Sequence, residues 1–61
     1  MTAQDIIEIL EKKALDFEDK AAKEDTKAPT DRNLNRLYGC HLAARAMRDL
    51  IHEIRLKEEL A

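Results

Sequence analysis

The sequence predicts an all-α protein: an antiparallel two-helix hairpin that dimerises into a four-helix bundle. Three observations lead to this prediction. The chain of 61 residues is dominated by strong helix formers and has one glycine and one proline. Two long segments repeat apolar residues mostly at alternating steps of three and four, the spacing of a packed helical face. A short polar segment that contains the proline separates them.

A single domain, residues 1–61, is expected, and its first helix covers about residues 2–23. Thr2 is a good N-cap, and Asp5 three residues later forms a variant of the capping box. The apolar residues then follow an unbroken heptad pattern, which indicates that one face of this helix packs against another helix. This first seam consists of Ala3, Ile7, Leu10, Ala14, Phe17 and Ala21.

Residues 24–30 lack this pattern and are expected to form the turn. Pro29 disfavours helical backbone at the residue before it. Thr30 is a good N-cap and Asp31 suits a first helical turn, so the second helix is expected over about residues 31–58. Its seam consists of Leu34, Leu37, Cys40, Ala44, Met47, Ile51 and Ile54.

A connection of this length places the two helices antiparallel. In this arrangement, acidic residues beside the first seam lie on the same side of the hairpin as basic residues beside the second seam. We expect Glu11 to lie near Arg48, and Glu18 to lie near His41. Each exposed pair of this kind contributes about 0–1 kcal/mol to stability.

The second helix is apolar over more than its seam, which predicts a second contact. A chain of about 60 residues buries only about 60% of its unfolded surface and usually needs a disulfide, a metal or oligomerisation. Cys40 is the only cysteine, so a disulfide within the chain is excluded, and we expect a homodimer. The candidate dimer face consists of Gly39, Ala43, Ala46 and Leu50. Its small side chains let a second backbone come close; the alternative is that they simply suit a helix.

A second candidate site is a stripe of basic and aromatic side chains on one face of the second helix. This stripe consists of Tyr38, His41, Arg45, Arg48, His52 and Arg55. Arginine holds phosphates and carboxylates through paired hydrogen bonds, so one interpretation is binding to a nucleic acid, a nucleotide or an acidic protein. The other is that the stripe pairs with acidic residues of the first helix. The sequence leaves both interpretations open.

The sequence contains no Gly-rich phosphate loop, paired catalytic acids, catalytic triad or zinc motif. We therefore expect no catalytic residues, no cofactor and no metal, and a protein that is not an enzyme. Cys40 is expected to be a buried apolar residue. No apolar stretch has the roughly 18 residues needed to span a membrane, and the N-terminus lacks the basic start of a secretory signal. The expected compartment is the cytoplasm.

The second helix also carries a resemblance. Tyr38-Gly39 is followed by Ala43, Ala44 and Ala46, and then by Leu50-Ile51 and Ile54. This pattern resembles short helical-hairpin proteins of phages and mobile elements, over about half of the chain. The resemblance implies no catalytic residues; it implies attachment to a host protein, a nucleic acid or a signalling molecule, in the host cytoplasm for a phage protein. In size and architecture the expected dimer also resembles plasmid RNA-binding helix bundles.

The leading hypothesis is a small non-enzymatic binding or regulatory protein. It acts as a homo-oligomer and engages an unidentified protein partner, as a phage-type inhibitor of a host factor does. One alternative is nucleic-acid or nucleotide binding through the stripe, although a net charge of −2 disfavours non-specific binding. Another is a structural subunit of a larger complex, docked through the tail leucines Leu56 and Leu60.

Overall fold

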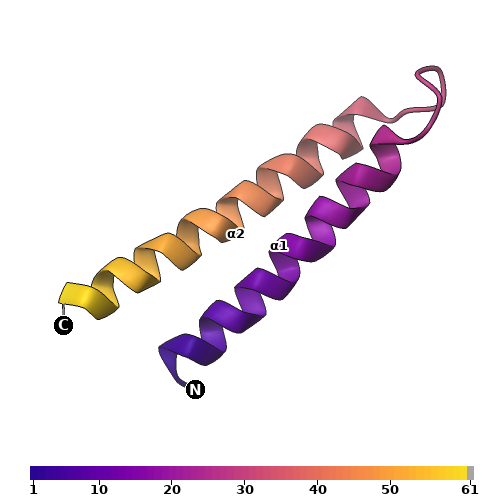
Figure 1. Ribbon diagram of the computed structural model, residues 1–61. Coiled ribbons are helices and arrows are strands. Elements are labelled where there is room, and N and C mark those ends of the chain that lie inside the picture. Colours follow the sequence, from indigo (N-terminus) through magenta and orange to yellow (C-terminus); the bar gives the residue numbers. More distant parts are fainter. Residues whose placement is uncertain (61) are drawn as a thin grey trace.

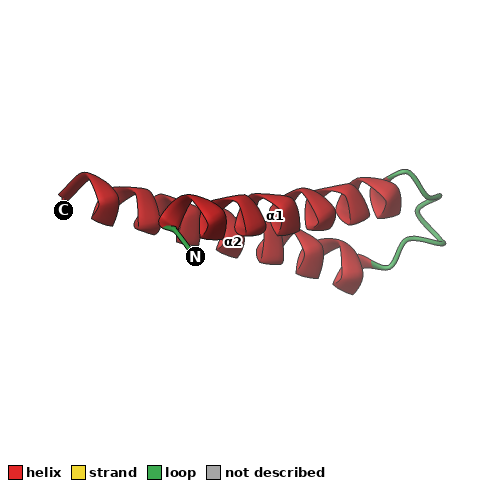
Figure 2. Cartoon of the chain, turned by 90° about the horizontal axis from the view of Figure 1, so that it is seen from below, coloured by secondary structure: helices red, strands yellow, loops and turns green. Residues whose placement is uncertain are grey.

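The computed structural model describes residues 1–60, which form two α-helices joined by one loop (Figure 1). Helix α1 spans Ala3–Asp25 and helix α2 spans Leu34–Leu60. The helices lie side by side and antiparallel, in a rod of 50 × 16 × 12 Å (Figure 2). The prediction of a helical hairpin is confirmed. The dimeric four-helix bundle stays a prediction, and Ala61, the last residue of the expected domain, lies outside the described residues.

Helix α1 begins with a complete capping box. The Thr2 hydroxyl accepts a hydrogen bond from the backbone N–H of Asp5 at 3.1 Å, and the Asp5 carboxylate accepts one from the backbone N–H of Thr2 at 3.0 Å. Two backbone donors at the helix start are thereby satisfied. The helix continues to Asp25, with Thr26 as its C-cap, and so runs past the end expected near residue 23.

Helix α2 begins at Leu34 rather than near residue 31. The side-chain oxygen of Asn33 accepts a hydrogen bond from the backbone N–H of Arg36 at 3.1 Å, so Asn33, not Thr30, is the N-cap. The loop before it is held to α1 by Arg32, whose guanidinium donates to the carbonyl of Asp25 at 2.8 Å. The Arg32 contact joins residues seven positions apart, so the capping preference of single residues does not reveal it.

The core is a thin line of side chains between the helices. The buried apolar residues are Ile7, Ala14, Ala21, Leu37, Cys40, Ala44 and Ile51. All of them belong to the expected seams, which confirms the two helical faces. The seam residues between them remain partly exposed, and no large side chain of the described residues is fully buried. The core enclosed by the hairpin alone is therefore narrow. Over residues 1–60, neither helix combines the length and the apolar character needed to cross a membrane.

Candidate functional site

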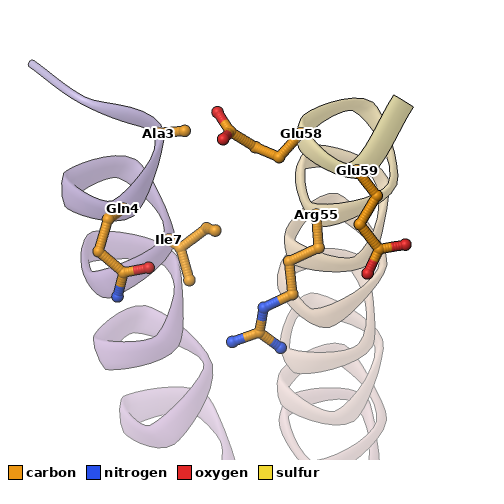
Figure 3. Close-up of a pocket in the computed structure, with 6 residues that line it drawn as sticks. All are labelled: Ala3, Gln4, Ile7, Arg55, Glu58 and Glu59. Carbon is orange, nitrogen blue, oxygen red and sulfur yellow. The ribbon is translucent and has the colours of Figure 1, made fainter. Parts of the chain in front are cut away.

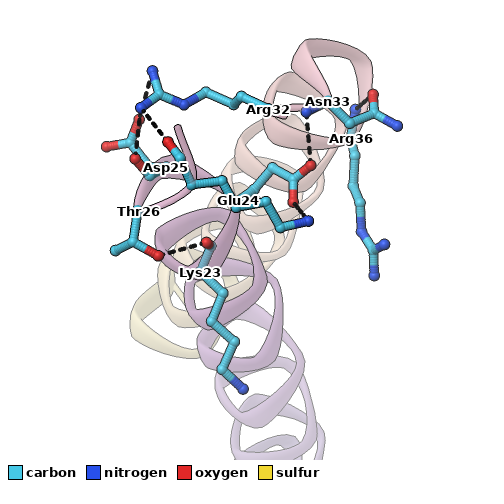
Figure 4. A network of polar contacts seen from close by, with 8 residues as sticks. Lys23, Glu24, Asp25, Thr26, Arg32, Asn33 and Arg36 are labelled. Carbon is cyan, nitrogen blue, oxygen red and sulfur yellow. Dashed lines mark hydrogen bonds and ion pairs between the residues drawn. The ribbon is translucent and has the colours of Figure 1, made fainter. Parts of the chain in front are cut away.

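The loop is joined to both helices by Glu24, which the sequence pattern assigned to the turn. Glu24 lies in the last turn of α1 and is only 3% exposed. Its carboxylate accepts a hydrogen bond from the backbone N–H of Asn33 at 2.8 Å (Figure 4). The same carboxylate pairs with the Lys27 ammonium at 2.6 Å. The Lys27 contact and then the Asn33 N–H lower the pKa of Glu24, while burial opposes them. This network fixes the closed end of the hairpin.

The stripe predicted on α2 is exposed along its whole length, and the structure divides it into two groups. The Arg48 guanidinium pairs with Glu18 at 2.7 Å, and the Arg55 guanidinium pairs with Glu11 at 2.9 Å. Both arginines therefore bridge to α1, as the second interpretation of the stripe requires. The remaining members have no ion-pair partner among residues 1–60: Tyr38, His41, Arg45 and His52.

The predicted partners of these charges were wrong, because Glu11 does not pair with Arg48 and Glu18 does not pair with His41. Side chains in a helix lean toward its N-terminus. In α1 this direction leads away from the loop, and in α2 it leads toward the loop. Glu18 and Arg48 therefore lean toward each other across an offset of about one heptad, whereas residues directly opposite lean apart.

The predicted dimer face is open in the single chain. Gly39, Ala46 and Leu50 are exposed and Ala43 is partly buried, and a Cβ added at Gly39 would meet nothing within 4 Å. Packing inside the hairpin therefore gives no reason for a glycine at this position. The spacing of the face continues in both directions to Arg36 and Glu53. We call the resulting heptad series the outer seam: Arg36, Gly39, Ala43, Ala46, Leu50 and Glu53.

Sequence reasoning missed Leu42 as a member of the exposed apolar surface. Leu42 lies beside the outer seam and is 67% exposed, more than Leu50 at 44%. Its position four residues before Ala46 was a usable signal, but a search for one face per helix at heptad spacing passes over it. Leu42 and Leu50 together give this side of α2 two large uncovered aliphatic side chains.

The open end of the hairpin has a shallow hollow of about 270 Å³ (Figure 3). Its walls are formed by Ala3, Gln4, Ile7, Arg55, Glu58 and Glu59. The hollow lies between the start of α1 and the end of α2, beside the predicted tail. The tail leucines are uncovered as expected, with Leu56 43% and Leu60 87% exposed.

No three His, Cys, Asp or Glu side chains of the described part of the chain come together in a way that could hold a metal ion. Cys40 is a free thiol buried on the seam, at 9% exposure. Comparison of the chain with known protein families, with curated proteins and with solved structures finds no match. The features that define the chain are thus a thin helical hairpin, an exposed outer seam and a basic stripe in which Arg48 and Arg55 are paired with α1.

Proposed function

We propose that this chain is a small non-enzymatic binding protein that works as a homodimer and engages a macromolecular partner. One observation carries the proposal: α2 exposes large apolar side chains, while the hairpin fully buries none among its described residues. Burial of apolar surface stabilises by about 25 cal/mol per Å², so a surface of this kind favours association. Contiguous exposed apolar surface is also typical of interaction sites.

The homodimer leaves a second surface for the partner. The side chains of Tyr38, Arg45 and His52 are exposed on α2 and have no ion-pair partner within the described chain. Tyrosine and arginine are the residue types that most often dominate the energy of protein interfaces. A dimer presents this surface twice. In line with the resemblance to phage hairpin proteins, we propose a host protein as the partner, met in the host cytoplasm.

The solution mass tests the first half of this proposal. Sedimentation equilibrium over a dilution series should give twice the chain mass of 7.0 kDa at high concentration and a reversible shift toward the monomer on dilution. A monomer at every concentration would contradict the homodimer. For the second half, immobilised wild-type chain should retain a host protein that a Tyr38→Ala/Arg45→Ala variant does not retain.

Nucleic-acid or nucleotide binding is a second proposal, supported by the exposed Tyr38 and Arg45 on the same face of α2. The ion pairs of Arg48 and Arg55 with α1 leave less free positive charge than the sequence suggests. A complex that contacts several phosphates weakens steeply as salt rises. Titration with single-stranded and duplex oligonucleotides at two salt concentrations would reveal this dependence, and an Arg45→Glu variant should abolish binding.

A structural subunit is the third proposal, and it depends on the exposed Leu56 and Leu60. The substitutions Leu56→Asp and Leu60→Asp test it, because they remove the apolar surface of the tail without shortening α2. Loss of co-purifying subunits in these variants would favour this proposal over the first.

A further inference from the structure

We propose that the second copy docks along the outer seam of α2 in the antiparallel sense, with Arg36 of each copy against Glu53 of its partner. This inference rests on the proposed homodimer and specifies its geometry. The evidence comes from the order of residues in the outer seam, from their exposure and from the length of the seam. Each of these points to a second copy of the same chain.

The outer seam follows the heptad steps of a coiled-coil core, and all of its members are exposed except the partly buried Ala43. In an antiparallel pair of identical helices, each layer joins an early residue of one copy to a late residue of the other. The order of the seam then places Gly39 opposite Leu50 and Ala43 opposite Ala46. A large side chain thus faces the residue without a side chain, and two alanines face each other at the centre.

The same pairing brings opposite charges together at both ends of the seam. Arg36 precedes this apolar stretch and Glu53 follows it, so an antiparallel dimer joins each arginine to the glutamate of the other copy. Figure 4 shows the Arg36 guanidinium apart from the dashed contacts of Glu24. Over the residues that the structure describes, neither Arg36 nor Glu53 has an ion-pair partner.

A parallel arrangement is unfavourable at both ends of the outer seam and at Gly39. Arg36 would face Arg36, Glu53 would face Glu53, and the space beside Gly39 would stay empty. Like charges across an interface are unfavourable, and a void loses packing contacts. Charge and size therefore select the same orientation independently.

The length of the outer seam also suits a second copy. A stable interface buries about 800 Å² on each partner. The outer seam runs over residues 36–53, about 27 Å of helix, so a contact of this area must also include the side chains at its edges. Leu42 lies at one edge of the outer seam and Met47 at the other, and an aligned partner covers both. The interface then has an apolar centre with charges at its ends, as protein interfaces commonly have.

Charge reversal tests the orientation and the register. Arg36→Glu places like charges at both ends of the dimer, and Glu53→Arg does the same with the opposite sign. Because each substitution changes two symmetric contacts, we expect the dimer dissociation constant to rise about tenfold in either single variant. The double variant Arg36→Glu/Glu53→Arg restores both contacts and should return the constant to within about twofold of the wild type.

Two controls keep the result interpretable. Lys12→Glu and Asp16→Lys make the same charge changes on the outer side of α1 and should leave the dissociation constant unchanged. Circular dichroism of each variant shows that the hairpin still folds. Sedimentation of the wild type tests the homodimer itself. If the wild type is dimeric but the double variant has a dissociation constant as high as that of the single variants, the antiparallel pairing alone is overturned. A monomeric wild type would overturn the homodimer and, with it, this inference.

Discussion

The carboxylate of Glu24 accepts a hydrogen bond from the backbone N–H of Asn33 at 2.8 Å, which joins the last turn of α1 to the N-cap of α2. The Lys27 ammonium pairs with the same carboxylate at 2.6 Å, and both contacts are stronger when the carboxyl group is ionised. The stability of the closed end of the hairpin should therefore depend on pH.

Acid should weaken the hairpin through Glu24. The Lys27 ammonium, and then the Asn33 N–H, hold the pKa of Glu24 below its ordinary value of 4.5. A carboxyl group with a lowered folded pKa contributes stability that is fully present above its unfolded pKa and is lost as the pH falls through its folded pKa. We expect the melting temperature, followed by circular dichroism, to decrease as the pH falls below about 4.5.

A Glu24→Gln variant should melt at a lower temperature than the wild type at pH 7 and should lose part of this acid dependence. The amide keeps the shape of the side chain but removes the charge that holds Lys27. Asp16→Asn, at an exposed position on α1, is the matched control and should change neither property. An unchanged acid transition in Glu24→Gln would show that other carboxylates govern it.

Loss of the N-cap should destabilise α1. Thr2→Ala removes the hydroxyl that accepts from the Asp5 N–H, and capping substitutions of this kind cost about 1 kcal/mol. Thr2→Ser keeps an accepting hydroxyl and should cost much less. Urea denaturation of both variants measures the difference, and equal stability of the two would contradict a capping role for Thr2.

The packing of the seam can be tested by making the same substitution, isoleucine to valine, at a buried position and at an exposed one. Ile51 is 3% exposed and Ile9 is 48% exposed. Ile51→Val should cost about 0.5–1.5 kcal/mol in the free energy of unfolding, because the lost methylene was packed between the helices. Ile9→Val should stay within about 0.5 kcal/mol of the wild type, as surface substitutions usually do. A larger loss at Ile9 than at Ile51 would place the core elsewhere.

The ion-pair register can be measured by double-mutant cycles. Alanine substitutions at Arg48 and Glu18 should give a coupling energy of about 0.2–1 kcal/mol in urea denaturation. The cycle between Arg48 and Glu11 should give a coupling close to zero, because Glu11 pairs with Arg55. The reverse result would support the direct pairing expected from the sequence.

Gly39→Ala should affect folding and association in opposite directions. An added methyl group meets nothing within 4 Å inside the hairpin, and alanine favours a helix over glycine by about 1 kcal/mol. The helix content and the stability of the dilute monomer should therefore rise. In the proposed dimer the same methyl group crowds Leu50 of the other copy and should raise the dimer dissociation constant. Tighter association of Gly39→Ala would contradict the proposed layer.

The sequence was sufficient for the hairpin because heptad spacing shows which face of each helix packs inward, although Leu34 on the second seam is 54% exposed. Ile7, Ala14, Ala44 and Ile51 all lie on the expected seams and are buried. Local preference alone did not decide the start of α2, because Thr30 and Asn33 are both good N-cap residues in isolation. Asn33 is the cap in the fold, where its backbone N–H meets the carboxylate of Glu24.

The sequence predicted which surfaces carry the candidate sites, but it did not predict which side chains contact one another there. The spacing placed the stripe on one exposed face, yet it could not show that Arg48 and Arg55 reach Glu18 and Glu11. Those pairs depend on the direction in which side chains lean along two opposed helices. Leu42, by contrast, was predictable, because its position four residues before Ala46 places it on the outer side of α2, where it is 67% exposed.

The anchored loop has a consequence for how this protein can be engineered. Loops of hairpins are the usual places for inserted tags, epitopes and fluorescent domains. Here Arg32 and Glu24 fasten both sides of the loop, so an insertion between Lys27 and Asn33 would cut the contacts that close the rod. The open end, where Met1 is 89% exposed, is the safer attachment point for such cargo.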